Sequence, residues 1–160
     1  MPKQINIELS AEGINKGIKD LQHYKSWVLA KEAELRTRLA VLGLNVASIQ
    51  FAEAPYVGKN DVSVRIDDTG SVAVIYAEGQ SVAFIEFGAG AKYGYGHPQA
   101  AEFGVGPGTY PDGKGHWNDP KGWWYGGQHT YGNTPAMAMY LAVQEMTAQL
   151  TEIAREVFST

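Results

Sequence analysis

Apolar residues follow a helical period near both ends of the chain and a strand period in between. Residues 5–9 alternate between aliphatic and polar side chains, which predicts a short strand with one buried face. Ser10 offers an N-cap for a helix whose apolar positions lie between residues 14 and 21, although Gly13 and Gly17 weaken that helix. We expect a break in the chain near residues 23–26.

A longer amphipathic helix is predicted from Val28 to Ile49. Its apolar residues recur three, four or seven positions apart and so keep to one stripe of the helix surface. Gly43 lies inside this stripe, and we expect a bend rather than an end there. Pro55 ends the helix, because the residue before a proline avoids helical backbone. A stripe of this length packs on a sheet or on another helix.

Three apolar segments after this helix read as strands. They cover residues 62–66, 72–77 and 82–87, and they are separated by short turns at residues 67–70 and 78–80. Because short turns join neighbouring strands in opposite directions, we predict a three-stranded antiparallel meander.

The periodic pattern disappears between Gly88 and Gly132. This segment holds thirteen of the 19 glycines, three of the four histidines and nine aromatic residues. A disordered linker would lack the aromatic residues, and a structureless loop of this length is rare unless it has a function. We therefore interpret it as an inserted loop that becomes ordered against a partner, with Gly88 and Gly90 as its hinge.

The last helix is predicted from Thr134 and Pro135, which suit an N-cap and a first helical position. Its apolar residues keep a regular stripe from Met139 to Val157. The expected fold is α+β. A small antiparallel sheet packs against two long helices, and residues 1–160 form a single domain with the loop inserted before the last helix.

Composition narrows the classes of function. The 160 residues carry a net charge of −4 and no long basic run, which disfavours nucleic acid as a partner. There are no cysteines, so disulfides, thiolate metal sites and cysteine nucleophiles are excluded. No stretch approaches the roughly 18 apolar residues of a membrane span, and the start lacks a signal-peptide pattern.

Cofactor motifs are weak. Residues 108–115 have the Gly-x-x-x-x-Gly-Lys spacing of a phosphate-binding loop, but Gly115 replaces the magnesium-binding Ser or Thr, and no strand or helix flanks the motif. His97, His116 and His129 match no compact zinc signature. We expect no cofactor and no metal.

Glu86 is the most notable carboxylate, because its neighbours are apolar and a buried carboxylate needs a partner. We favour a structural role for Glu86, as a cap of the backbone amides of the Gly88–Gly90 turn or a partner of an arginine, over catalysis. The aromatic residues of the loop suit a protein interface, core filling or sugar stacking, and the interface is the preferred interpretation. The interface candidates are Tyr93, Tyr95, Trp117, Trp123, Trp124 and Tyr125.

Residues 84–90, Phe-Ile-Glu-Phe-Gly-Ala-Gly, resemble the F-x-E-F-G-[TS]-G signature of a family of tailed-phage neck or tail-completion proteins, the gene-product-10-like proteins of lambdoid siphophages. Ala89 replaces the usual Thr or Ser. The order of elements is also similar, including the proline-opened last helix, although the Phe and Arg usual after that proline are absent.

The resemblance implies a non-enzymatic virion component, assembled in the host cytoplasm at the joint between head and tail. Its expected partners are other copies of itself in a ring and the phage connector, neck and tail proteins. Glu86, Gly88 and Gly90 would then anchor an assembly loop. The alternative is a metal- or carboxylate-dependent cell-wall glycan hydrolase, or a sugar-binding module, that uses Glu86 with His97, His116 or Asp119.

Overall fold

The computed structural model describes residues 7–90, 92–105, 119–125 and 127–159. The three helices are α1 (Ala11–Glu53), α2 (Val82–Phe87) and α3 (Ala138–Ser159). Two antiparallel pairs of strands accompany them, β1 (Ser63–Asp68) with β2 (Ala73–Glu78) and β3 (Trp123–Tyr125) with β4 (Gln128–Thr130). The prediction of an α+β fold with a long helix, a small antiparallel sheet and a C-terminal helix is confirmed.

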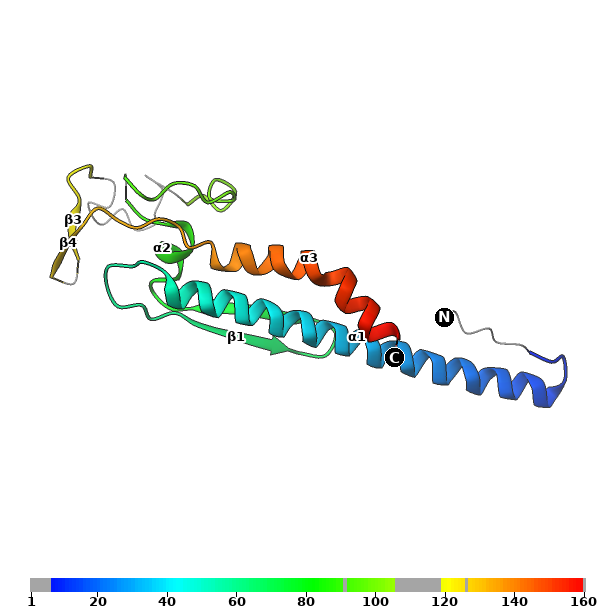
Figure 1. The fold of residues 1–160 in the computed structure, drawn as a ribbon. Coiled ribbons are helices and arrows are strands. Elements are labelled where there is room, and N and C mark those ends of the chain that lie inside the picture. Colours follow the sequence, from blue (N-terminus) through cyan, green and yellow to red (C-terminus); the bar gives the residue numbers. More distant parts are fainter. Residues whose placement is uncertain (1–6, 91, 106–118, 126, 160) are drawn as a thin grey trace.

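The elements are arranged around α1 (Figure 1). α3 runs antiparallel to α1 beside its C-terminal half, and the β1–β2 hairpin lies along another side of the same half. α2 and the β3–β4 hairpin gather at the end where α1 finishes. The first turns of α1 project beyond the body as an arm, residues 11–26. No helix among the described residues is long and apolar enough to cross a membrane.

The expected break near residues 23–26 is wrong, because α1 is continuous. Ser10 caps its start as predicted, with its Oγ accepting the N–H of Gly13 at 3.0 Å. Gly17 lets the chain before the helix fold back, since a Cβ at this position would lie 2.9 Å from Ile7. α1 ends at Glu53 with Ala54 already extended (ψ 130°), as Pro55 predicts.

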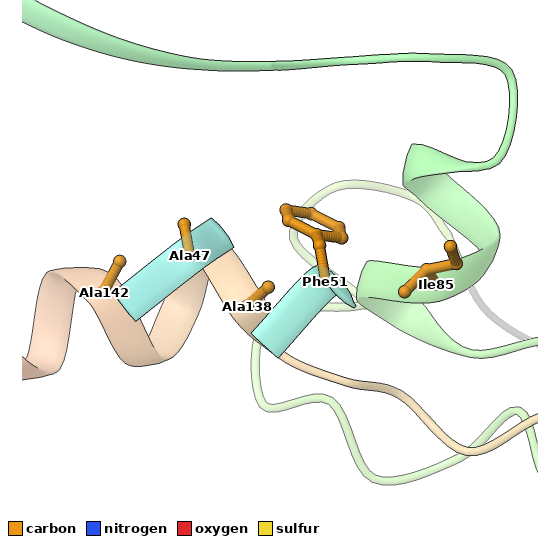
Figure 2. Packing of buried hydrophobic residues seen from close by; sticks show 5 residues of the cluster. All are labelled: Ala47, Phe51, Ile85, Ala138 and Ala142. Carbon is orange, nitrogen blue, oxygen red and sulfur yellow. The ribbon is translucent and has the colours of Figure 1, made fainter. Parts of the chain in front are cut away.

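The core joins the three helices through small side chains (Figure 2). Ala47 of α1 and Ala138 and Ala142 of α3 are almost fully buried. Phe51 of α1 and Ile85 of α2 complete the same buried cluster. One turn earlier, a Cβ at Gly43 would lie 2.6 Å from Sδ of Met146 in α3. Alanine and glycine thus let α1 and α3 approach closely, and adding volume there would force the helices apart.

The hairpin has the register Arg65↔Tyr76 and Asp67↔Val74. Val64, Ile66, Ile75 and the other inward residues are less exposed than their neighbours, so one face covers α1. This pairing confirms the first two predicted strands as an antiparallel pair.

The predicted third strand is wrong, because residues 82–87 form α2. An apolar run of this length is compatible with a strand or a buried helix, and periodicity alone does not distinguish them. Ile85 and Glu86 are consecutive and both buried, at 0% and 4% exposure. In a strand they would point to opposite faces, whereas one helical turn places Ile85 in the core and Glu86 beside the start of α3.

The predicted strand at residues 5–9 is also absent from residues 7–9, the part of it that the structure describes. Residues 7–9 are not in a strand, and residues 5 and 6 lie outside the described range. Leu9 is 96% exposed and Ile7 is 49% exposed. An alternating segment therefore stands at the start of the chain without a strand partner among the described residues.

Candidate functional site

Glu86 caps the N-terminus of α3. Its Oε2 accepts the backbone N–H of Met139 at 2.9 Å, and its Oε1 accepts that of Tyr140 at 3.1 Å. These two amides belong to the second and third helical residues, whose N–H groups have no partner within the helix. A carboxylate at this end also interacts favourably with the helix dipole. One side chain from α2 thus supplies the cap that a local Ser, Thr, Asp or Asn normally provides.

The predicted helix start at Thr134 and Pro135 is wrong, because the residues that follow them bind α2 instead of beginning the helix. The N–H of Ala136 is donated to the carbonyl of Ile85 at 2.8 Å, and that of Met137 to the carbonyl of Glu86 at 3.2 Å. These residues are therefore bound to the end of α2, and Met137 has a φ of 55°. The helix begins only at Ala138, with the carbonyl of Met137 accepting its first hydrogen bond.

His97 completes the surroundings of the Glu86 carboxylate. Its Nε2 lies 3.2 Å from Oε1 of Glu86, and both side chains are almost completely buried. Its Nδ1 accepts the N–H of Gln99 at 3.1 Å, so the proton of a neutral ring is assigned to Nε2, which donates to Glu86. Both ring nitrogens are used within the fold, and neither is directed at a substrate position.

Aromatic rings enclose His97. The ring of Phe87 lies 4.4 Å from that of His97, and Tyr140 lies 5.7 Å from it in an edge contact. Phe103 packs on Phe87 at 5.6 Å. Part of the segment predicted as a loop, residues 92–105, is therefore held on α2 and α3 by a buried histidine and not only by its ends.

A second set of contacts joins the two ends of the Gly-rich segment between Gly88 and Gly132, which we call the excursion. Ala89 and Asn133 exchange backbone hydrogen bonds of 2.9 and 3.0 Å, and the Asn133 side chain donates to the carbonyl of Phe84. Gly90 (φ 88°) and Gly132 (φ 98°) lie beside this bridge, where a Cβ at Gly132 would be 1.8 Å from the oxygen of Ala89. We call this bridge between residues 88–90 and 132–133 the clamp.

The predicted anchor residues all lie at this point. Glu86, Gly88 and Gly90 are buried, and a Cβ at Gly88 would lie 2.8 Å from the ring of Pro135. Such close contacts on the α3 side favour an anchor over a hinge. The expectation that Glu86 caps backbone amides identified the correct kind of contact, but the amides belong to α3 and its other partner is a histidine.

Beyond the clamp, the β3–β4 hairpin carries a continuous row of exposed aromatic rings. Trp124 and His129 are opposite each other in the register, with ring centroids 5.6 Å apart, and His129 contacts Tyr131 at 5.0 Å. The Lys92 ammonium lies over the rings of Tyr131 and Tyr93, at 5.2 and 5.0 Å. We call these five residues the aromatic tip.

The tip is accessible. Trp124 is 73% exposed, Tyr131 44% and Tyr93 37%. The hydrogen bond with Tyr93 and the nearby Tyr131 raise the pKa of Lys92 above its ordinary value. Lys92 places a positive charge over the rings of Tyr93 and Tyr131 in this exposed aromatic cluster.

The other predicted interface residues are distributed differently. Tyr95 is 61% exposed, whereas Trp123 is half-buried and lies over Gly90. The backbone of Tyr125 belongs to β3, and Trp117 lies outside the described residues. Trp123 therefore partly fills space in the fold, and Trp124 and Tyr95 are the most exposed of the predicted interface residues whose side chains the structure describes.

Glu86 and His97, which were candidates for catalysis, use their polar atoms for hydrogen bonds within the fold. Both oxygens of Glu86 accept backbone amides, and Oε1 also faces Nε2 of His97. His129 lies on the tip, and His116 and the phosphate-loop-like residues 108–115 lie outside the described residues. Among the described residues, no group of three or more His, Asp or Glu side chains is placed to hold a metal.

Sequence reasoning missed Asn133, Tyr140 and Phe103, which complete the site. Nothing in their spacing distinguishes them, because their partners are distant in the sequence. Tyr140 contacts Glu86 and His97, Phe103 contacts Phe87, and Asn133 contacts Phe84 and Ala89. The sequence carried no signal for the cap from Glu86, because Thr134 offered a local N-cap and the start at Ala138 is set by contacts with α2.

Comparison with known proteins leaves the site to be interpreted from its own geometry. No protein-family model, no curated protein and no solved structure matches the chain.

Proposed function

We propose that this protein is a structural component of a tailed-phage particle, placed at the joint between head and tail, where copies assemble into a ring through protein contacts. The resemblance of residues 84–90 to the signature of phage neck and tail-completion proteins supports this placement. In this chain the signature residues perform structural work, since Glu86 caps α3 and Gly88 and Gly90 form the clamp.

The aromatic tip is the observation that carries the proposal. Three of its rings, those of Trp124, His129 and Tyr131, are exposed and contiguous, and they lie on the β3–β4 hairpin or directly after it. Tryptophan and tyrosine contribute most of the binding energy at protein interfaces, because they bury a large area and lose little conformational freedom. A platform of this kind, presented to solvent, is suited to docking on another protein.

The elongated arrangement supports assembly into a closed ring. The tip lies at one end of the α1–α3 pair and the arm projects from the other end (Figure 1). Different surfaces at the two ends favour heterologous contacts, in which each copy offers one end to the next. Such contacts generate a ring when the rotation between copies closes.

The proposal is tested with Trp124→Ala combined with Tyr131→Ala, in phage particles assembled with the variant chain. We expect the variant to fold and the yield of complete, infectious particles to fall at least tenfold, because hot-spot rings each contribute about 2 kcal/mol or more. The matched control is Val72→Ala, which removes an exposed apolar side chain elsewhere. Normal particle yield from the double variant would overturn the proposal, as would a cell-wall glycan that quenches the fluorescence of Trp124.

A further inference from the structure

An apolar groove of about 390 Å³ runs between β2 and α3. Its walls are residues 73–75 of β2 and residues Met139, Val143 and Met146 of α3, and its floor is α1 around Leu39 and Ala40. Among the described residues that line it, Arg36 alone is charged, and its guanidinium is already paired with Glu32 and Asp68. The groove therefore suits aliphatic side chains.

The wall formed by β2 is an open sheet edge. Among the described residues the sheet has only two strands, so β1 covers one edge of β2 and no strand covers the other. Residues 73, 74 and 75 all line the groove, which places the uncovered edge of β2 along it. An open edge offers backbone N–H and C=O groups to a further strand, and such edges are common sites of strand addition.

The chain contains a segment with the matching pattern. Residues 5–9 alternate between aliphatic and polar side chains. In the described part, Ile7 and Leu9 are separated by one polar residue and would share a face if the segment were extended. Leu9 is almost fully exposed in the single chain, at 96%.

The segment cannot reach the groove of its own chain. The helix from Ala11 to Arg36 is about 38 Å long at 1.5 Å per residue, and Arg36 marks the near end of the groove floor. Ile7 is four residues before Ala11 and extends at most about 14 Å from it. Only the groove of another molecule is therefore within reach.

We propose that residues 7–9 of one copy add as a third strand to β2 of a second copy, with Ile7 and Leu9 entering the groove beside Val143. This contact rests on the proposed ring assembly and identifies one of the surfaces that would build it. The donor segment and the groove are different surfaces, so each copy gives one strand and receives another, as a heterologous ring requires.

The arm extends the same contact. Ile14, Ile18 and Leu21 keep one stripe along it, and each is about half exposed. The arm is about 24 Å long, so it carries the donor strand well clear of its own body. Its stripe adds apolar area to a strand contact that would be small by itself compared with a stable interface.

Cysteine crosslinking tests the contact directly, because the chain has no cysteine of its own. In the double variant Leu9→Cys and Val143→Cys, a short bis-maleimide should give a ladder of covalent multimers on a denaturing gel. Both native side chains are more than half exposed, so both substitutions leave the fold intact. Mixing the two single variants should give dimers that contain one chain of each kind.

The matched control pairs Leu9→Cys with Ile49→Cys, since Ile49 is 54% exposed on α1 and does not line the groove. Equal crosslinking of the control pair would overturn the proposal. Dimers formed by Leu9→Cys alone would also overturn it, because they indicate a symmetric contact between two donor segments. A chain that remains monomeric at every concentration tested would do the same.

Charge substitutions provide a second, independent measurement. Leu9→Asp or Val143→Asp should each weaken self-association at least tenfold in native mass spectrometry, whereas Ile49→Asp should not. Leu9→Asp combined with Val143→Lys should recover part of the loss. Intact particles from Leu9→Asp, together with lost particles from the tip variant, would reject this contact and leave the proposed function standing.

Discussion

The carboxylate of Glu86 accepts the backbone N–H of Met139 at 2.9 Å, although 53 positions separate these residues in the sequence. The start of α3 is therefore fixed by α2 and not by the residues that precede it. Because the same carboxylate meets His97, one buried group joins α2, α3 and the beginning of the Gly-rich segment. The start of α3 and the attachment of residues 92–105 thus depend on a common contact.

Glu86→Ala should lower the free energy of unfolding by about 3 kcal/mol, because it removes a helix cap and leaves buried donors on Met139, Tyr140 and His97. Glu86→Gln should cost less, since it retains one acceptor oxygen. Urea denaturation measures both values.

The control for this prediction is Glu78→Ala. Glu78 pairs with Arg65 on the exposed face of the hairpin, and such a solvent-exposed pair adds little to stability. Equal losses of stability for Glu86→Ala and Glu78→Ala would show that the cap contributes no more to stability than an exposed ion pair.

His97→Ala should release residues 92–105 without unfolding the helices. The substitution removes the contacts of the ring with Phe87 and Tyr140 and the acceptor of the Gln99 amide. Hydrogen exchange should therefore accelerate at least tenfold at Gln99 and Val105, while the amides of α1 stay protected. His129→Ala, which alters only the tip, should leave these rates unchanged. Uniform acceleration across the chain would contradict the prediction.

The hydrogen-bonded carboxylate of Asp61 should make the folded state less stable in acid. Its carboxylate accepts the Oγ–H and N–H of Ser81 and the N–H of Gln80, and these bonds lower its pKa from 3.8 to about 2. Because the folded-state pKa is depressed, the contribution is fully present above about pH 4 and is lost as the pH falls towards 2. Asp61→Asn should remove this part of the pH dependence, as measured by unfolding between pH 2 and 5. A variant with the same acid profile as the native chain would refute the assignment.

Gly132→Ala and Gly70→Ala form a matched pair, because their φ values are 98° and 95°. Alanine at Gly70 meets no atom within 4 Å and should cost about 1–2 kcal/mol through backbone strain alone. Alanine at Gly132 also collides with the carbonyl of Ala89, so it should open the clamp and cost several kcal/mol more. Thermal unfolding compares the two variants, and equal shifts would contradict the proposed close contact.

Several elements were predictable because their signals are local. Ser10 caps α1, Pro55 ends it, and the short turn between the first two predicted strands gave the hairpin its correct antiparallel pairing. The buried Glu86 was recognised as a residue that needs a partner, because an unpaired carboxylate in an apolar environment is costly.

The errors come from contacts between distant residues. Residues 82–87 form a helix because Ile85 and Glu86 both face inward, towards the core and towards α3. Thr134 and Pro135 have the local pattern of a helix start, but the amides of Ala136 and Met137 bind the end of α2. No local pattern reports such partners. The buried role of His97 was likewise hidden by the assumption that the whole segment after Gly88 is a loop.

The clamp at Ala89 and Asn133 has a consequence for how this chain tolerates change. It fastens both ends of the excursion to the core, and His97 also fastens residues 92–105, so a change of length after Val105 should alter the core little. Doubling the length of such a closed segment costs only about 0.6 kcal/mol of chain entropy. Insertions, deletions or a grafted binding sequence are therefore best accommodated between Val105 and the β3–β4 hairpin, while Glu86, His97 and the helices keep one fixed scaffold.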